Sequence, residues 1–262
     1  MFFFGYAASI LIGFSLGLIG GGGSILTVPV LVYLFHLDPV LATAYSLFIV
    51  GSTSLAGGLR FYPKKLIDFQ AVWMFGIPSI ITVILTRKFL VPYIPETIFT
   101  IGNFVLHKGM MLMLLFAFLM FVSAMRMIRQ NKLEETSKEK KSSYLFFLVL
   151  DGLFVGIVTG LLGAGGGFLI IPALVLLMNI PMKKAVATSL VIIAINSLIG
   201  FVFSLSSIQV DWPELLSITA IAIVGVLIGI SLSNKVTPAS LKKGFGWFVL
   251  CMAFYILFRE LF

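Results

Sequence analysis

The chain alternates between long apolar segments and short polar connections. Most apolar segments approach the roughly 20 residues that a helix needs to cross a bilayer. Because lipid offers no hydrogen bonds to the backbone, such segments are expected to be helical. The pattern predicts a helical hairpin and three further helices, twice over: hairpin 2–35 with helices 39–59, 68–86 and 98–128, then hairpin 144–178 with helices 185–204, 213–233 and 244–260.

Each predicted hairpin is interrupted by a cluster of glycines. The clusters lie at 13–24 and 156–167, and a proline follows each of them five residues later, at Pro29 and Pro172. Glycine disfavours helix because it loses the most backbone entropy on ordering. In lipid, the freed peptide groups cost several kcal/mol each unless protein or a water-filled cavity covers them. Matching breaks in two halves are typical of a transporter binding site.

The two halves are copies of one sequence. Residues 13–57 align without a gap on 156–200, and 19 of the 45 aligned positions are identical, including most glycines and the proline. Apolar composition alone does not produce such matches, so the chain contains an internal duplication. We divide it into a first repeat (1–128), a polar linker (129–143) and a second repeat (144–262).

Composition places the chain among membrane proteins. It is 60% hydrophobic and 11% charged, with mean hydropathy +1.15, whereas soluble domains carry about 25% charged residues. The net charge of +8 does not indicate nucleic acid, because Lys and Arg gather in cytoplasmic loops of membrane proteins. The single cysteine, Cys251, excludes an internal disulfide, and no metal-ligand spacing is present. The predicted class is an all-α polytopic membrane protein without cofactor or metal.

The distribution of basic residues predicts the topology. If each broken segment crossed the membrane fully, 10 of the 18 Lys and Arg residues would share one side. If each is instead a hairpin that enters and leaves on the same side, 14 of the 18 share one side, as the positive-inside rule requires. Each repeat then has three crossings, and the second repeat is inverted relative to the first. The linker is predicted to be cytoplasmic and both termini to lie outside.

The hairpin tips are the predicted binding site. A helix begins after each break, and its N-terminus carries free N–H groups and partial positive charge, which together attract anions. Small polar residues of the next helix can complete the coordination. The predicted substrate-binding residues are Gly22, Gly23, Ser24, Tyr45 and Ser46 in the first repeat and Gly165, Gly166, Gly167, Thr188, Ser189 and Asn196 in the second. The alternative is structural: tight turns, close helix packing and interhelical hydrogen bonds.

One acidic residue is a candidate for coupling transport to proton movement. Asp151 follows an apolar run, and an intramembrane carboxylate is a candidate for proton transfer; the alternative is a position near the membrane interface. The sequence contains none of the common catalytic motifs, so the protein is predicted not to be an enzyme.

The repeated glycine pattern with its proline, followed by Ala-x-Ala-Thr-Ser-Leu at 185–190, resembles the TauE/SafE family, the sulfite exporter or 4-toluene sulfonate uptake permease family. The resemblance implies transport of small sulfur-containing anions, such as sulfite or organosulfonates, across the inner (cell) membrane of a prokaryote, more commonly as export. The second copy matches the family pattern in full. The first departs from it at Ser24, where the third glycine belongs, and at Tyr45, where threonine belongs.

The leading hypothesis is therefore a secondary transporter, an exporter of a sulfur-containing anion that binds near the midplane between the two tips. Two alternatives remain open: a passive anion channel, and a membrane partner in a sulfur-relay pathway that transports nothing itself. Its surroundings are the lipid bilayer. Neither the direction of transport, nor the coupling ion, nor assembly as a homo-oligomer follows from the sequence.

Overall fold

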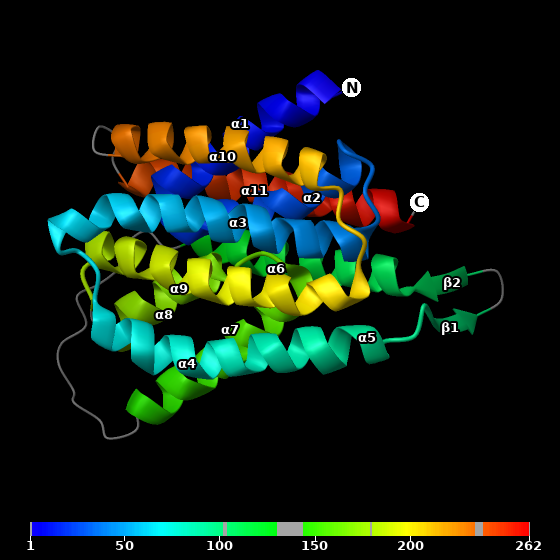
Figure 1. Cartoon of the computed structure of the whole chain (residues 1–262), viewed down its shortest axis with the longest axis horizontal. Coiled ribbons are helices and arrows are strands. Elements are labelled where there is room, and N and C mark those ends of the chain that lie inside the picture. Colours follow the sequence, from blue (N-terminus) through cyan, green and yellow to red (C-terminus); the bar gives the residue numbers. More distant parts are fainter. Residues whose placement is uncertain (1, 102–103, 130–143, 179, 234–237, 262) are drawn as a thin grey trace.

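The computed structural model describes residues 2–101, 104–129, 144–178, 180–233 and 238–261, and they form a bundle of helices (Figure 1). The elements of the first repeat are α1 (Phe2–Ile19), η1 (Gly20–Leu26), α2 (Thr27–Tyr33), α3 (Pro39–Phe61), η2 (Tyr62–Lys64), α4 (Phe69–Leu85), η3 (Thr86–Leu90), α5 (Val91–Tyr93), β1 (Thr97–Ile101), β2 (Phe104–His107) and α6 (Lys108–Arg129). Those of the second are α7 (Tyr144–Leu162), α8 (Gly167–Met178), α9 (Met182–Ser204), η4 (Leu205–Ser207), α10 (Trp212–Ser233) and α11 (Pro238–Leu261). Residues 130–143 of the predicted linker lie outside the described residues.

The bundle is that of a multi-pass membrane protein. Among the described residues, five helical segments are long and apolar enough to cross a bilayer: 39–64, 69–93, 108–125, 182–207 and 212–232. The helices on either side of the two glycine clusters are shorter, at 5–18, 23–33 and 148–162. The predicted all-α polytopic class is thereby confirmed, with a single two-stranded hairpin, β1–β2, as the β structure of the described residues.

That β hairpin corrects one predicted boundary. The helix expected over 98–128 begins only at Lys108, and residues 97–107 instead supply two antiparallel strands in which Phe99 pairs with Leu106 and Thr100 with Val105. The reason lies in the residue types. Threonine, isoleucine and phenylalanine of 97–101 favour extended backbone. A short apolar run cannot be assigned to helix or strand by hydrophobicity alone.

The glycine clusters interrupt their helices as predicted. In the first repeat α1 ends at Ile19 and the chain turns through η1 before α2 begins. In the second, residues 163–166 separate α7 from α8. Gly20 and Gly163, which are equivalent in the duplication, share a φ of +71°, and Gly165 and Gly166 have φ of +66° and +67°. Only glycine adopts these left-handed angles at no steric cost. We call residues 20–24 the first break and residues 163–167 the second break.

The two repeats interlock. The most extensive helix contacts join one repeat to the other. α1 packs against α10, and α7, the equivalent of α1 in the second repeat, packs against α4. In the same way α3 packs against α9, and α6 against α11. Equivalent helices run in opposite directions, as the colours of α3 and α9, of α4 and α10 and of α6 and α11 show in Figure 1. Neither repeat therefore covers its own helices, and both are needed to bury the breaks.

Glycines let the paired helices touch. A Cβ atom on Gly13 of α1 would lie 2.9 Å from the backbone nitrogen of Val226, and one on Gly225 of α10 would lie 3.2 Å from Cα of Gly13. In the other repeat, a Cβ on Gly160 of α7 would lie 2.6 Å from Cβ of Thr86. Such small residues at helix contacts are characteristic of membrane proteins. The glycines at the start of each cluster, Gly13 and Gly17 in α1 and Gly156 and Gly160 in α7, therefore lie at helix contacts in both copies.

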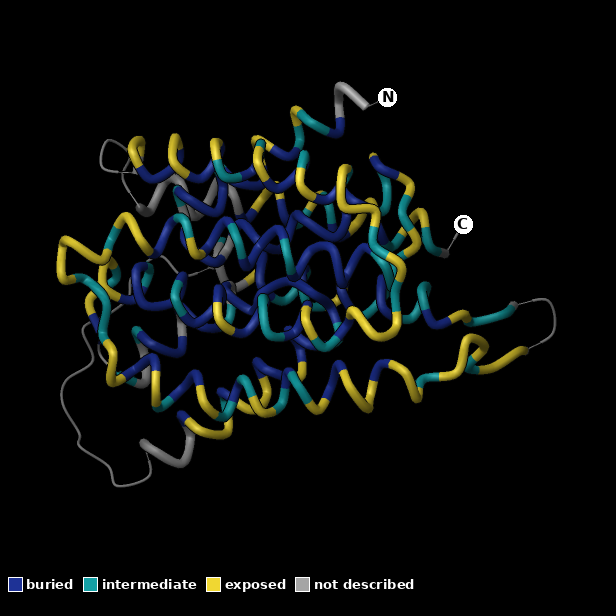
Figure 2. The backbone as a smooth tube through the Cα atoms, viewed as in Figure 1, coloured by how far each residue is buried: buried dark blue, intermediate teal, exposed yellow. Residues whose placement is uncertain are grey.

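Burial separates the centre of the bundle from its outer faces. Figure 2 shows buried backbone along α3 and α9 and exposed residues on the outward sides of α4 and α10. Several outward-facing side chains are large and apolar, among them Leu59, Trp73, Phe118 and Phe258, each at least 60% exposed. A broad apolar surface of this kind is what contact with lipid requires.

Candidate functional site

The two breaks meet at the centre of the bundle. A Cβ atom on Gly167 would lie 2.5 Å from the carbonyl carbon and oxygen of Gly21, and one on Gly21 would lie 2.8 Å from the carbonyl carbon of Gly167. Real Cβ atoms do not approach other atoms so closely, so the two backbones are in direct contact and any side chain here would separate them. The predicted meeting of the tips is therefore present in the structure.

Ser24 joins the two breaks. Its side chain is fully buried, and its hydroxyl lies 2.7 Å from the carbonyl oxygen of Gly21 and in closer contact with that of Ala164 in the second break. Because a hydroxyl has one proton, the two carbonyls share it. The serine that departs from the glycine pattern in the first copy thus supplies a side-chain link between repeats.

Side chains of α3 and α9 surround the second break. Ser46 donates a hydrogen bond of 2.9 Å to the carbonyl oxygen of Gly163. A Cβ on Gly165 would lie 2.7 Å from Cγ1 of Val50, 2.9 Å from Cγ2 of Ile193 and 3.3 Å from the hydroxyl of Ser197. The second break is therefore enclosed by one helix from each repeat.

The other predicted glycines, Gly22, Gly23 and Gly166, also lie within the breaks. Gly22 lies within η1, and a Cβ on Gly23 would lie 2.5 Å from the backbone carbon of Ser15 in α1. A Cβ on Gly166 would lie 2.7 Å from Cγ1 of Val155 and would also contact Thr159. Gly23 and Gly166 are equivalent, and both allow the chain to return alongside its own preceding helix.

The hydroxyls of Tyr45 and Thr188 form hydrogen bonds outside the two breaks. The Tyr45 hydroxyl accepts a hydrogen bond of 2.6 Å from the backbone N–H of Asp211, and the Thr188 hydroxyl accepts one of 2.9 Å from that of Asp68. These are equivalent bonds between the repeats. Both aspartates begin a helix, since Asp68 accepts from Ala71 N and Asp211 from Glu214 N. The two hydroxyls therefore fix the starts of α4 and α10.

Two further predicted residues, Ser189 and Asp151, lie in α9 and α7. Ser189 donates to the carbonyl oxygen of Val186 in its own helix, at 2.9 Å. Asp151 is half-buried in α7, twelve residues before Gly163, which is roughly 18 Å along a helix. The hydrogen bond of Ser189 stays within α9, beside Val186, whose Cγ1 would lie 2.9 Å from a Cβ on Gly20 of the first break.

Asn196 of α9 has unused hydrogen-bonding capacity. Its amide is fully buried, its Nδ2 lies 2.6 Å from the hydroxyl of Ser79, and its Oδ1 has no partner. Rotating the amide by half a turn makes Ser79 the donor and frees the NH₂ group instead. Asn196 can therefore present either an acceptor or a donor.

Several neighbouring polar atoms share this property. The buried hydroxyls of Ser54, Thr159 and Ser197 have no hydrogen-bond partner among the described residues. Ser54 and Ser197 are equivalent in the duplication, and Ser197 and Thr159 lie against Gly165 and Gly166. Since buried polar groups are normally paired, the hydroxyls of Ser197 and Thr159 have spare hydrogen-bonding capacity beside the second break. The sequence signal was the equivalence of Ser54 and Ser197, which the prediction did not use.

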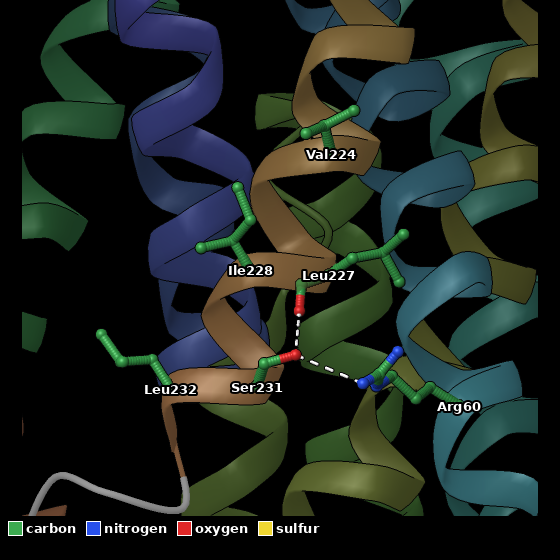
Figure 3. Close-up of a pocket in the computed structure, with 6 residues that line it drawn as sticks. All are labelled: Arg60, Val224, Leu227, Ile228, Ser231 and Leu232. Carbon is green, nitrogen blue, oxygen red and sulfur yellow. Dashed lines mark hydrogen bonds between the residues drawn. The ribbon is translucent and has the colours of Figure 1, made fainter.

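A surface pocket lies elsewhere on the molecule. It has a volume of about 430 Å³ and is lined by Arg60, Val224, Leu227, Ile228, Ser231 and Leu232. Figure 3 shows Arg60 of α3 reaching across to Ser231 of α10, with a hydrogen bond of 3.2 Å. Its other walls are apolar, and none of the predicted site residues lines it. It is not the candidate site.

These features define the class of the protein. Two helix breaks from interlocked repeats meet inside a multi-pass bundle, and unpaired polar groups surround the second of them, as in transporters that bind substrate at discontinuous helices.

Comparison with known proteins agrees with this class and makes it specific. The chain matches the family described as "Sulfite exporter TauE/SafE" over residues 6–256, and it belongs to that family of membrane transporters. A Xylella fastidiosa relative, named "Probable membrane transporter protein", is 27% identical over 255 residues, covering 95% of this chain and 92% of the relative. YunE of Bacillus subtilis, which carries the same description, is 29% identical over 233 residues and 83% of each chain. No solved structure matches the chain.

Proposed function

We propose that the protein is a secondary transporter that exports a small sulfur-containing anion, such as sulfite or an organosulfonate, by alternating access. The observation that carries the proposal is the contact between the two breaks, Gly21 against Gly167, because each repeat contributes one face of the site. The family supports transport in general, and its description supports a sulfur oxyanion as cargo. Backbone N–H groups at breaks can bind an anion without a basic side chain.

The proposed site is centred on the breaks. It comprises Gly22, Gly23 and Ser24 of the first break, Gly165, Gly166 and Gly167 of the second, and the flanking side chains Ser46 and Asn196. Tyr45 and Thr188 support it from outside, since their hydroxyls are engaged with Asp211 and Asp68. Ser189, whose hydroxyl bonds Val186, is a further flanking side chain of the proposed site. In the described state the breaks are in contact, so binding requires them to part. That movement is the conformational step of the proposed cycle.

The proposed orientation places the linker in the cytoplasm and both termini outside, in the inner membrane of a prokaryote. The end of α3 and the start of α9 lie at one end of the bundle in Figure 1, and this end carries Arg60, Lys64, Lys65, Lys183 and Lys184. The β hairpin lies at the opposite end. Basic residues on one side support cytoplasmic placement of that side.

Cysteine labelling tests the orientation. After Cys251→Ala, we expect Thr100→Cys to react with a membrane-impermeant maleimide in intact cells, because Thr100 is exposed on β1. Ser137→Cys in the linker should react only after the membrane is permeabilised. Labelling of Ser137→Cys in intact cells would contradict the proposed topology.

Flux into proteoliposomes tests the function. We expect uptake of radiolabelled sulfite or methanesulfonate that saturates with concentration and accelerates when a pH gradient is imposed. If Asp151 couples transport to protons, Asp151→Asn keeps saturable flux and loses the response to the gradient. Glu135→Gln in the predicted polar linker is the matched control, because it removes a carboxylate of the same type outside the apolar segments.

The other outcomes of this measurement are equally informative. Flux that rises linearly with concentration and ignores the gradient identifies a passive channel. Absence of flux for every sulfur anion tried favours a membrane partner without transport of its own. A gradient response that survives in Asp151→Asn removes that carboxylate from the coupling step.

A further inference from the structure

Arg87 is a cation in an unusual place. It lies in the apolar segment 69–93, which is long enough to cross the membrane, yet its side chain is only 3% exposed. It belongs to η3, a π-helical turn, and such turns are frequent at functional sites.

Its position is next to the second break. η3 packs against α7 and α9, and Thr86, the neighbour of Arg87, contacts Gly160, three residues before the second break begins. Along the same faces of α4 and α9, Ser79 bonds Asn196 and Val83 contacts Gly200, with its Cγ1 2.9 Å from a Cβ placed there. Arg87 lies one turn beyond Val83. It therefore continues the helix face on which Ser79 bonds Asn196 and Val83 contacts Gly200.

The guanidinium has two unused donors on one edge. Nε and Nη2 are buried and have no hydrogen-bond partner among the described residues. These two nitrogens point their hydrogens in parallel, in the fork that receives two oxygens of one carboxylate, phosphate or sulfonate. The described ion pair of the structure, Lys108 with Glu96, does not involve Arg87. A buried charge without a partner is strongly destabilising, so its retention calls for a ligand.

The duplication shows that packing does not require an arginine. Ile230 occupies the equivalent position in the second repeat and is 1% exposed. Its backbone nitrogen would lie 2.9 Å from a Cβ on Gly17, in α1. An apolar side chain therefore satisfies the same helix contact in the other copy. Only Arg87 adds charge, and it does so on one side of the site.

We propose that Arg87 binds the transported oxyanion through Nε and Nη2, as the cationic residue of the path beside the second break. The inference rests on the proposed function. A tetrahedral or pyramidal anion with at least two free oxygens, such as a sulfonate or sulfite, offers one acceptor atom to each N–H of this edge. Chloride offers a single atom to both. Arg87 then makes the site asymmetric, so that one repeat carries the charge and the other the apolar surface.

Thermal shift of the purified protein tests the proposal. We compare the wild type with Arg87→Lys, Arg87→Ile and the exposed neighbour Lys88→Gln, with sulfite or methanesulfonate against chloride at equal ionic strength. Ligands that bind the native state raise its melting temperature. Binding to Lys88→Gln should equal that of the wild type. We expect at least about tenfold weaker binding for Arg87→Lys, which keeps charge and loses the fork, and about 100-fold for Arg87→Ile.

The melting temperature without ligand separates a binding role from a structural one. Arg87→Ile should melt a few degrees higher than the wild type, because it removes an unpaired buried charge. Unchanged anion binding by Arg87→Ile overturns the inference and leaves the proposed function standing. A wild type that binds neither anion overturns both. Stabilisation of the wild type by phosphatidylglycerol alone, lost in Arg87→Ile, would assign the guanidinium to a lipid headgroup and overturn the inference as well.

Discussion

Gly167→Val is expected to abolish transport. The backbones of Gly167 and Gly21 are in direct contact, and a Cβ at Gly167 has the carbonyl carbon and oxygen of Gly21 at 2.5 Å. Backbone atoms cannot rotate away as a side-chain end can, so the breaks must separate. Overpacking of this kind typically costs about 1–3 kcal/mol, and it would also alter the surface offered to the substrate. Saturable flux in proteoliposomes should fall below detection.

The reciprocal variant and a matched control make this result specific. Gly21→Ala should be impaired as well, since a Cβ there would lie 2.8 Å from the carbonyl carbon of Gly167 and 2.5 Å from Cδ1 of Ile193. Gly76→Ala in α4 is the control, because among the described residues no atom outside its own stretch of helix lies within 4 Å of a Cβ at that position. It should gain roughly 0.5–1 kcal/mol of helix stability and transport normally. Normal flux in Gly167→Val would show that the contact between the breaks has no part in transport.

Local backbone chemistry made the breaks predictable. Glycine and proline restrict or free the backbone at the position that they occupy, so the repeated motif indicates where the helices end. Gly20 and Gly163, which are equivalent, accordingly have the same φ. The β hairpin at 97–107 was missed for a complementary reason. Its residues are apolar enough for a membrane helix, and only their β-branched and aromatic character distinguishes them.

Side-chain direction was not predictable in the same way. Tyr45 and Thr188 lie on helices that line the centre, but the sequence does not state that their hydroxyls turn to Asp211 and Asp68 of the opposite repeat. The bonds could be inferred only by treating the equivalent pairs together. The burial of Arg87 could not be predicted from the sequence. It results from packing of η3 against α7 and α9, and the sequences of these helices do not indicate that contact.

Asn196→Leu is expected to raise the apparent KM for the anion at least about tenfold. One end of the amide bonds Ser79 and the other has no partner, so the free end is available to substrate. A hydrogen bond to a charged group contributes about 1.5–3 kcal/mol, which corresponds to roughly ten- to 150-fold in affinity. Initial rates of sulfite uptake against concentration give the KM.

Ser79→Ala distinguishes binding from support. It removes the partner of Asn196 and keeps the amide, so if the free end binds substrate, Ser79→Ala should retain most of the affinity that Asn196→Leu loses. If the amide serves only to hold Ser79, both variants should show the same modest loss of stability, about 1 kcal/mol for an interhelical bond in a membrane, and the same kinetics.

Asn196→Thr adds a test from the duplication, since Thr53 stands at the equivalent position and bonds Ile49 and Val50 of its own helix. A threonine hydroxyl at 196 can bond its own helix in the same way. The Asn196→Thr variant should therefore transport as poorly as Asn196→Leu and lose no more stability than the bond to Ser79 contributes, about 1 kcal/mol.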